Sequence, residues 1–252
     1  AEPYPHGVRR SVPAACALAI AVLMASVGAG IVTAAPIESG GTATVRAERL
    51  GNQVSTKPLP SAPTARYRIT IISEWTPSSH PASRPSNSHF SPTVLINHGA
   101  PGDLFIVGSP ASPGIERMAE TGATGTLRAE LATDGSVSDI STGRSIFGIG
   151  QNSFDVTAAR GDDLISLVTM LAPSPDWFVG VRDVDLLRVD GWVDRLLLDL
   201  GNYDAGTDSG ADFGSPNADT NPVQVISGPR DQAFAQAAAE NRFGRVVVER
   251  LG

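Results

Sequence analysis

The sequence predicts an all-β fold with one or two short helices. Its 26 glycines and 19 prolines, with only 6% aromatic residues, are typical of a loop-rich β protein rather than a helical bundle. Short apolar or alternating runs recur along the chain, and turn-forming residues separate them. Many short strands divided by turns form either a sandwich or a barrel.

The first 35 residues have the order of an export signal. Paired arginines at 9–10 precede an apolar run over residues 12–32, and small residues follow at 33–35. A positive segment, an apolar segment and a small-residue cleavage site define a secretory signal peptide. The run is also long enough to remain as an uncleaved single-span anchor. Residues 1–35 are therefore expected to be a signal peptide or a membrane anchor.

Residues 36–65 have no sustained hydrophobic period and contain scattered Gly, Thr, Ser and Pro, which predicts a disordered linker. The folded domain is expected over residues 66–252. Cys16 is the only cysteine, so no disulfide can form within the chain. The net charge of -7, without a basic stripe, argues against a nucleic-acid partner.

The predicted strands begin at Tyr67–Ile71, where apolar and polar residues alternate as in a strand with one wet face. Residues 76–92 are rich in Pro, Ser and Asn, and a loop of this length favours a functional or well-tethered segment. Residues 164–171 are nearly all apolar, which predicts a central strand buried on both faces. The other predicted strands are 93–98, 104–107, 126–133, 153–158, 177–181, 192–200, 223–226 and 245–251.

Two segments are predicted as short helices. In the first, residues 113–120, Ser112 is the N-cap, Pro113 takes the first position and Gly122 is the stop signal. The second, residues 231–240, is rich in alanine.

Carboxylates gather on the turns of the stretch 173–210. Asp176 lies in a Pro-Ser-Pro-Asp turn, where the prolines fix the direction of the backbone. Asp204 is followed by Gly206, which lets the backbone fold tightly around an ion. Crowded carboxylates repel unless a cation or a donor lies between them, and calcium prefers such oxygen ligands. The alternative is that these are ordinary turn aspartates capping nearby N–H groups.

Several separated motifs resemble, in the right order, those of the spondin domain, the N-terminal domain of secreted spondins and of many bacterial proteins. The most specific are Ser-Leu-Val-Thr-Met-Leu-Ala-Pro-Ser-Pro-Asp-Trp-Phe-Val-Gly at 166–180 and Asp-Ala-Gly-Thr-Asp-Ser-Gly at 204–210. Further matching segments are 67–75, 80–81, 89–92, His98, 108–114 and 119–122. The resemblance implies an antiparallel β-sandwich similar to a C2 domain, with calcium-binding loops at one end.

The resemblance also implies which residues bind Ca²⁺. Asp176 and Asp204 match ligand positions, and the backbone carbonyl of Asn202 is their expected companion. Asp155 is the candidate for the remaining carboxylate, on a strand where animal spondin domains have a glutamate. Thr157, two residues further along the same strand, competes for that position.

Other polar motifs have simpler explanations. Asp208 has a weaker claim to the metal and is expected to cap its own loop. Asp183 and Asp185 are expected at a solvated hairpin end. Arg-Gly-Asp at 160–162 spells an integrin-recognition tripeptide, but a turn favours Gly and Asp anyway. The spacing of His80, His89 and His98 fits no helical metal motif, so hydrogen bonding to loop carbonyls is expected.

These features predict a secreted or cell-surface, non-enzymatic, calcium-binding adhesion module whose partner is an extracellular protein or glycan. The chain would contact a membrane only through its N-terminal segment, if that segment stays uncleaved. The competing hypothesis is an extracytoplasmic hydrolase that uses the same ion as a Lewis acid. It requires His80 or His89 to lie over the metal end as a general base.

Overall fold

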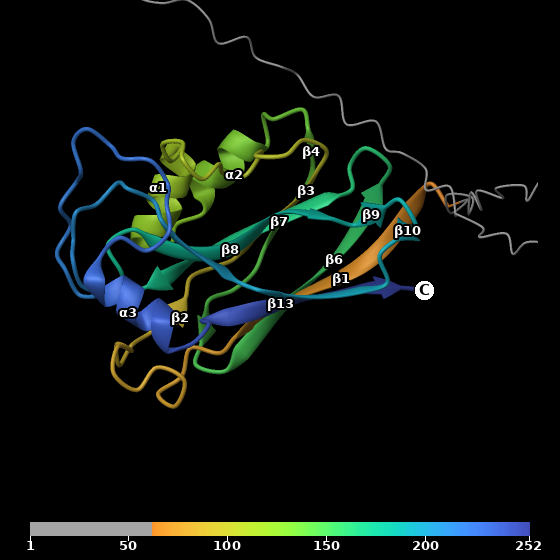
Figure 1. Cartoon of the computed structure of the whole chain (residues 1–252). Helices are drawn as coiled ribbons and strands as arrows, with labels where there is room; N and C mark the ends of the chain where they lie inside the picture. Colours follow the sequence, from red (N-terminus) through yellow and green to blue (C-terminus); the bar gives the residue numbers. More distant parts are fainter. Residues whose placement is uncertain (1–61) are drawn as a thin grey trace, which may run out of the picture. The chain divides into compact units, whose positions relative to one another are not determined.

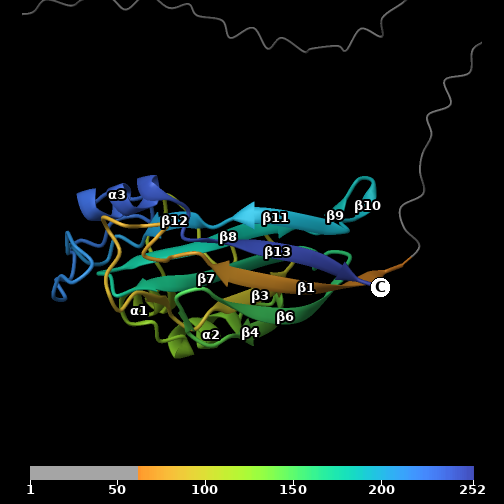
Figure 2. The same cartoon turned by 90° about the horizontal axis from the view of Figure 1, so that it is seen from below.

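Two antiparallel sheets face each other in residues 62–252, the part of the chain that the structure, a computed structural model, describes (Figures 1 and 2). The predicted signal or anchor, and most of the predicted linker, lie outside the described residues. Strand β1 begins at Thr64, so the last two residues of the predicted linker already belong to the sheet. No helix in the described part is both long and apolar enough to cross a bilayer.

The smaller sheet joins the first and last strands of the domain. Its order is β11 (Arg195–Asp199), β13 (Gly244–Leu251), β1 (Thr64–Ser73) and β6 (Gly150–Ala159). Alternate residues of β1 are buried, as the alternating sequence predicts. The inward side chains of this strand are Ala65, Tyr67, Ile69 and Ile71.

The larger sheet is built around β7 (Leu164–Ala172), which is buried along almost its whole length as predicted. Beside it lie β8 (Trp177–Asp185) and then β12 (Gly201–Asp204). Its other edge pairs with β2 (His89–Phe90) and β3 (Val94–His98), which continue to β5 (Ile146–Phe147) and β4 (Val137–Thr142). A small separate hairpin consists of β9 (Leu187–Arg188) and β10 (Gly191–Trp192).

Three short helices complete the domain. Helix α1 (Pro113–Thr121) starts and stops as predicted: the Ile115 N–H donates to the Ser112 hydroxyl, and Gly122 ends the helix with a left-handed φ of 70°. Helices α1 and α2 (Gly125–Leu131) cover one face of the larger sheet (Figure 1). Helix α3 (Gln232–Glu240) packs through Phe234, which stacks on Trp177.

Some predicted elements are wrong. Residues 126–133, predicted as a strand, form most of α2, because Leu127 and Leu131 are spaced for one face of a helix and both are buried. Residues 104–107 are a loop, and 223–226 form only isolated bridges. The predicted strand 192–200 is split between β10 and β11.

Both faces of the larger sheet are buried. One core lies between the two sheets and includes Tyr67, Trp75 and Trp177. The second lies under the helices and includes Phe105, Met118 and Phe178. The larger sheet is therefore the middle of three layers, and its strand ends are held rigidly where the candidate site forms.

Candidate metal centre

Asp176 and Asp204 meet at one end of the sandwich. Strand β12 pairs antiparallel with β8, and this register puts Asp204 opposite Trp177, next to Asp176. The Ala205 N–H donates to the Asp176 carbonyl at 3.1 Å and closes the end of the ladder. Both carboxylates are buried, with 0% and 3% of the residue exposed. The structure thus brings together the two aspartates that the sequence singles out.

The Asp176 carboxylate is only half satisfied. Its Oδ2 accepts the Thr207 N–H at 2.7 Å and the Asp208 N–H at 3.1 Å. Its Oδ1 is buried and accepts no hydrogen bond from any residue that the structure describes. Burial and the Asp208 charge raise the pKa of Asp176 above its ordinary value, and the backbone N–H groups of Thr207, Asp208 and Gly206 oppose that rise. A buried acceptor without a partner is unfavourable unless something else approaches it.

Asp204 lies in a more strongly perturbed environment. Burial and then the neighbouring Asp176 charge raise its pKa from 3.8 to about 7, although the Arg230 charge and the Gly206 N–H oppose them. The Gly206 N–H donates to Asp204 Oδ1 at 2.9 Å, and an Arg230 guanidinium nitrogen lies 3.4 Å from the same oxygen. The fold therefore buries two acidic groups near enough for the charge of Asp176 to raise the pKa of Asp204.

Asn202 adds a second unsatisfied oxygen. Its Oδ1 is buried without a hydrogen-bond partner in the described chain. Residues two apart on a strand point to the same face, so the Asn202 side chain lies on the face of β12 that carries Asp204. The sequence points to the Asn202 carbonyl as a ligand, whereas the unpaired oxygen in the structure belongs to the side-chain amide.

These residues fit a hard cation bound by few charged groups. Within residues 62–252, no set of three or more His, Cys, Asp or Glu side chains is arranged to hold a metal ion by itself. Two carboxylates and an amide oxygen are calcium-type ligands when backbone carbonyls or waters complete the shell. The donor set therefore suits calcium better than zinc, which favours nitrogen and sulfur.

Asp155 is not part of this cluster. It lies on the exposed face of β6, where its Oδ1 accepts the Arg68 Nε–H at 2.8 Å. Strand β6 begins at Gly150, and Asp155 lies five residues further on, so the two residues are roughly 17 Å apart along the strand. Thr157 points to the same exposed side. The structure leaves the predicted third carboxylate position without either residue.

Asp208 has the capping role expected for it. Its Oδ1 accepts the Gly210 N–H at 2.6 Å, and its Oδ2 accepts the Ala218 N–H at 2.8 Å. Both oxygens are thus used to tie the loop after β12 together. The loop is also closed by the Thr220 N–H, which donates to the Thr207 carbonyl at 2.7 Å.

Two residues near this site were not singled out from the sequence. Glu120, in the last turn of α1, has a pKa raised chiefly by burial, and a hydrogen bond with the Thr207 side chain opposes that rise. A negative charge in the last turn of a helix interacts unfavourably with the helix dipole, and this is the feature of the sequence that could have singled out Glu120. Arg230 follows a long irregular loop, and nothing in the sequence indicates its contact with Asp204.

The three histidines bind loop carbonyls, as the sequence predicts. His80 Nε2 lies 3.0 Å from the Asn241 carbonyl, and its Nδ1 lies 2.8 Å from the Ser79 hydroxyl. His89 Nδ1 is 2.9 Å from the Asn87 carbonyl. His98 Nδ1 is 2.8 Å from the Ala100 carbonyl.

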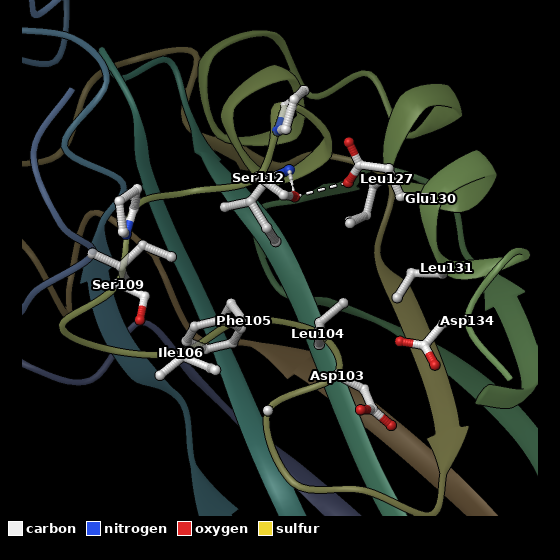
Figure 3. A pocket seen from close by; sticks show the side chains of 15 residues that line it. Asp103, Leu104, Phe105, Ile106, Ser109, Ser112, Leu127, Glu130, Leu131 and Asp134 are labelled. Atoms are coloured by element: carbon white, nitrogen blue, oxygen red, sulfur yellow. Dashed lines mark hydrogen bonds between the residues drawn. The ribbon is translucent and has the colours of Figure 1, made fainter. Parts of the chain in front are cut away.

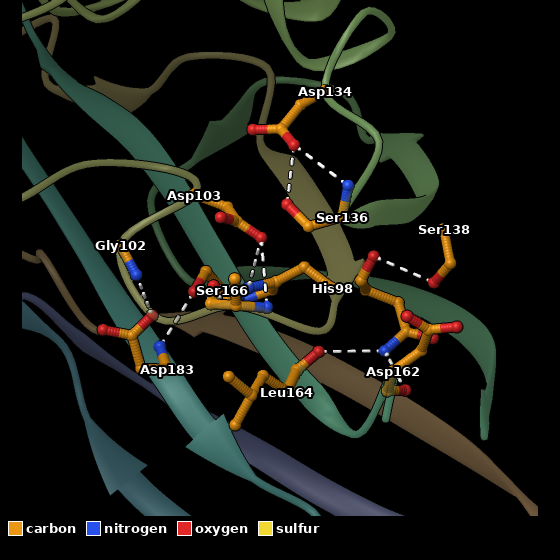
Figure 4. Close-up of polar contacts among 12 residues, drawn as sticks. His98, Gly102, Asp103, Asp134, Ser136, Ser138, Asp162, Leu164, Ser166 and Asp183 are labelled. Atoms are coloured by element: carbon orange, nitrogen blue, oxygen red, sulfur yellow. Dashed lines mark hydrogen bonds and ion pairs between the residues drawn. The ribbon is translucent and has the colours of Figure 1, made fainter. Parts of the chain in front are cut away.

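His98 also belongs to a Ser–His–Asp arrangement (Figure 4). Its Nε2 lies 2.9 Å from the Ser166 hydroxyl, and its Nδ1 lies 3.2 Å from Asp103 Oδ2. The Ser166 hydroxyl is buried on the central strand and accepts the Asp183 N–H at 2.8 Å. This geometry fixes three segments to one another, and the Ser166 side chain is buried within it.

The remaining motifs lie at the end of β8 and in the turn after β6. Asp183 is not a simple solvated hairpin end, since its Oδ1 accepts the Gly102 N–H at 2.9 Å and its φ is 53°. Asp185 is exposed and its Oδ1 accepts the Leu187 N–H at 2.8 Å. The Arg-Gly-Asp tripeptide at 160–162 occupies the turn between β6 and β7, where Gly161 has a φ of 90°.

Comparison with known proteins gives a consistent result. The family model described as Spondin_N matches residues 65–241. Human Spondin-2 is 34% identical over 174 residues, covering 65% of this chain and 52% of the relative. Chicken Spondin-1 is 34% identical over 205 residues, covering 75% of this chain and 26% of the relative. The chain thus spans about half of Spondin-2 and about a quarter of Spondin-1.

The match to the spondins places this chain among secreted or cell-surface proteins. The chain belongs to the spondin family.

Proposed function

We propose that this domain is a calcium-binding adhesion module without enzymatic activity, and that the loop end of its sandwich contacts an extracellular protein or glycan. The observation that carries the proposal is the buried Asp176 Oδ1, which has no partner among the described residues and belongs to a carboxylate whose charge raises the pKa of Asp204. A cation here would relieve both the unsatisfied oxygen and the repulsion between the acids.

Asp176, Asp204 and Asn202 are the residues proposed to hold the ion. A bound calcium ion supplies positive charge and accepts oxygen ligands. The backbone N–H groups of Thr207 and Asp208 donate to Asp176 Oδ2 and so orient the carboxylate, which leaves Oδ1 for the ion. Because the same loop segment continues to Arg230, ion binding is expected to order the loop surface that a partner would contact.

The histidine geometry supports a non-enzymatic role. A metal-dependent hydrolase requires a general base near the ion. Both ring nitrogens of His80 are engaged by Ser79 and Asn241, and the ring stacks on Phe243 at a centroid distance of 4.8 Å. His89 stacks instead on Phe147, at 4.5 Å. Neither imidazole has a contact with the Asp176 cluster.

The test is the calcium dependence of thermal unfolding in the full chain and in an Asp176→Asn variant. Calcium at about a hundredfold over its dissociation constant is expected to raise the free energy of unfolding by roughly 2.7 kcal/mol. Asparagine keeps the shape of the side chain but removes its charge, so Asp176→Asn should lose most of this increase. Differential scanning calorimetry in calcium and in chelator measures both.

Asp185→Asn is the matched control, because Asp185 is exposed and only caps its own turn. It should keep the calcium-dependent increase. Equal responses of the two variants, or an unfolding temperature of the parent chain that does not change with chelator, would contradict the metal assignment. Hydrolysis of an ester or phosphoester substrate that depends on His80 would contradict the non-enzymatic role.

A further inference from the structure

A cavity of about 380 Å³ opens between helices α1 and α2 and the segment 102–110 (Figure 3). Its volume is in the range of pockets that bind small ligands or single side chains. The segment 104–107, which the sequence predicts as a strand, leaves the sheet and forms one wall. The buried apolar side chains that line the cavity are Leu104, Phe105, Ile115, Leu127, Leu131 and Ile226.

One end of this cavity is acidic. Figure 3 shows the side chains of Asp103 and Asp134 at the same end, away from Ser109. The third acidic lining residue, Glu130, is already used, because its Oε1 accepts the Gly114 N–H and its Oε2 accepts the Ser112 hydroxyl, both at 2.8 Å. The free negative charge of the cavity therefore belongs to Asp103 and Asp134.

Each of these two carboxylates is held by one oxygen only. Asp103 Oδ2 contacts His98 Nδ1 at 3.2 Å, and buried His98 is itself fixed by Ser166 (Figure 4). Asp134 Oδ1 accepts the Ser136 N–H at 3.0 Å and its hydroxyl at 2.6 Å. These contacts leave Asp103 Oδ1 and Asp134 Oδ2 without partners within residues 62–252. Two anchored carboxylates thus each keep one oxygen for a ligand.

An exposed apolar surface continues from the other end of the cavity. Ile106 is 51% exposed, and Val107 and Val225 are each 40% exposed. Their segments are joined, since the Gly108 N–H donates to the Ile226 carbonyl at 2.8 Å and Pro110 bridges to Val225. Residues that flank a side chain inserted into the cavity would therefore meet an apolar surface.

We propose that this cavity binds an arginine side chain of a partner protein, with the guanidinium group between Asp103 and Asp134 and the aliphatic stem against the apolar walls. The two carboxylates favour a positively charged group. The apolar walls favour a side chain that carries this charge on a long apolar stem. Arginine presents five N–H donors in a planar fork, so it can donate to both free carboxylate oxygens. The compact ammonium of lysine is less suited to two separate acceptors.

The test uses the full chain and a short acetylated and amidated peptide, Ser-Val-Arg-Val-Ser, followed by NMR titration. Saturable shifts are expected at Leu104, Phe105, Leu127 and Leu131. A peptide with citrulline, the neutral analogue of arginine, should bind up to about fivefold more weakly, because a partly exposed ion pair contributes up to about that factor. The lysine peptide should fall between them.

Asp134→Asn in the full chain should weaken binding of the arginine peptide by a similar factor. Asp134 is exposed, so the variant is expected to fold even if Asp103→Asn, which alters the buried His98 contact, does not. Asp139→Asn is the matched control, because Asp139 is an exposed acid on β4 that does not line the cavity. It should leave the affinity unchanged.

Absence of saturable shifts at the cavity residues overturns the proposal. So does equal binding of the arginine and citrulline peptides, or an Asp134→Asn effect no larger than that of Asp139→Asn. Equal binding of the lysine peptide overturns the selectivity for guanidinium. The titration is run in calcium and in chelator, and the arginine effect is expected in both, since the acidic end shares no residue with the proposed metal ligands.

Discussion

Asp204 is a carboxyl group that the fold buries against a second carboxyl group. Its pKa of about 7 in the folded domain, raised by burial and by Asp176, compares with 3.8 for an unperturbed side chain. The folded state therefore holds this proton more tightly than the unfolded state. Stability from this group is present at acid pH and is lost as pH rises from about 4 to about 7.

Asp204→Asn should remove this pH dependence when calcium is absent. In chelator, the parent chain is expected to lose on the order of a few kcal/mol of unfolding free energy relative to the variant between about pH 4 and pH 7. Urea unfolding of both proteins at the two pH values measures the difference. An identical pH profile for the two proteins would show that Asp204 titrates normally in the fold.

Asp155 shows that the alternation of a strand can test a predicted metal ligand. Phe154 and Val156 are apolar and point into the core, so the alternation of a strand already places Asp155 on the wet side. The family resemblance suggested a metal role, but the strand period argued against it. Asp176 and Asp204 were predictable together because both flank apolar strands, whereas Arg230 lies beyond a loop whose path follows no local rule.

At the scale of elements, α1 is held at its start by more than its own cap. The Ser112 hydroxyl accepts the Ile115 N–H at 3.2 Å and donates to Glu130 of α2 at 2.8 Å. The Gly114 N–H also donates to Glu130. Ser112 therefore joins the two helices that form one side of the cavity.

Ser112→Ala should lower the free energy of unfolding by about 1–2 kcal/mol, since it removes the cap and leaves Glu130 with one fewer donor. Urea denaturation followed by circular dichroism measures this. Thr126→Ala is the control, because Thr126 is exposed on α2 and alanine favours a helix. A loss for Ser112→Ala no greater than for the control would show that the contact between helices contributes nothing to stability.

The helix α2 and the loop 104–107 show where local patterns mislead. Residues 126–133 read as alternating because Ala129 happens to fall between Leu127 and Leu131, yet the same two leucines also satisfy a helix. Only the packing of both onto α1 decides between the two periods. Residues 104–107 are apolar enough for a strand, but Leu104 and Phe105 are buried in the second core, Ile106 and Val107 are exposed, and the segment forms no strand.

At the scale of the whole molecule, the folded part begins before the predicted boundary at residue 66. The Trp192 Nε1–H donates to the Ala62 carbonyl at 3.2 Å, and the Arg160 N–H donates to the Pro63 carbonyl at 3.2 Å. Strand β1 then pairs with β6 from Thr64 onward. These contacts make residues 62–65 part of the domain.

A chain shortened to begin at Ala62 should therefore be more stable than one shortened to begin at Arg66. The second loses the Ala62 and Pro63 contacts and buried Ala65, so a difference of about 1–3 kcal/mol in unfolding free energy is expected. Chemical denaturation of both shortened chains tests it. Equal midpoints would place the true boundary at residue 66, as the sequence predicts.

The pairing of β1 with β13 determines when the core of this domain can close during synthesis. Ribosomes deliver β1 first and β13 last, yet Arg66 must pair with Leu251. Until the C-terminal strand emerges, β1 has no neighbour on that side, and the core between the sheets cannot close. This long-range pairing delays closure of the core until β13 has been synthesised. A nascent chain whose core is still open is one that a membrane channel can thread.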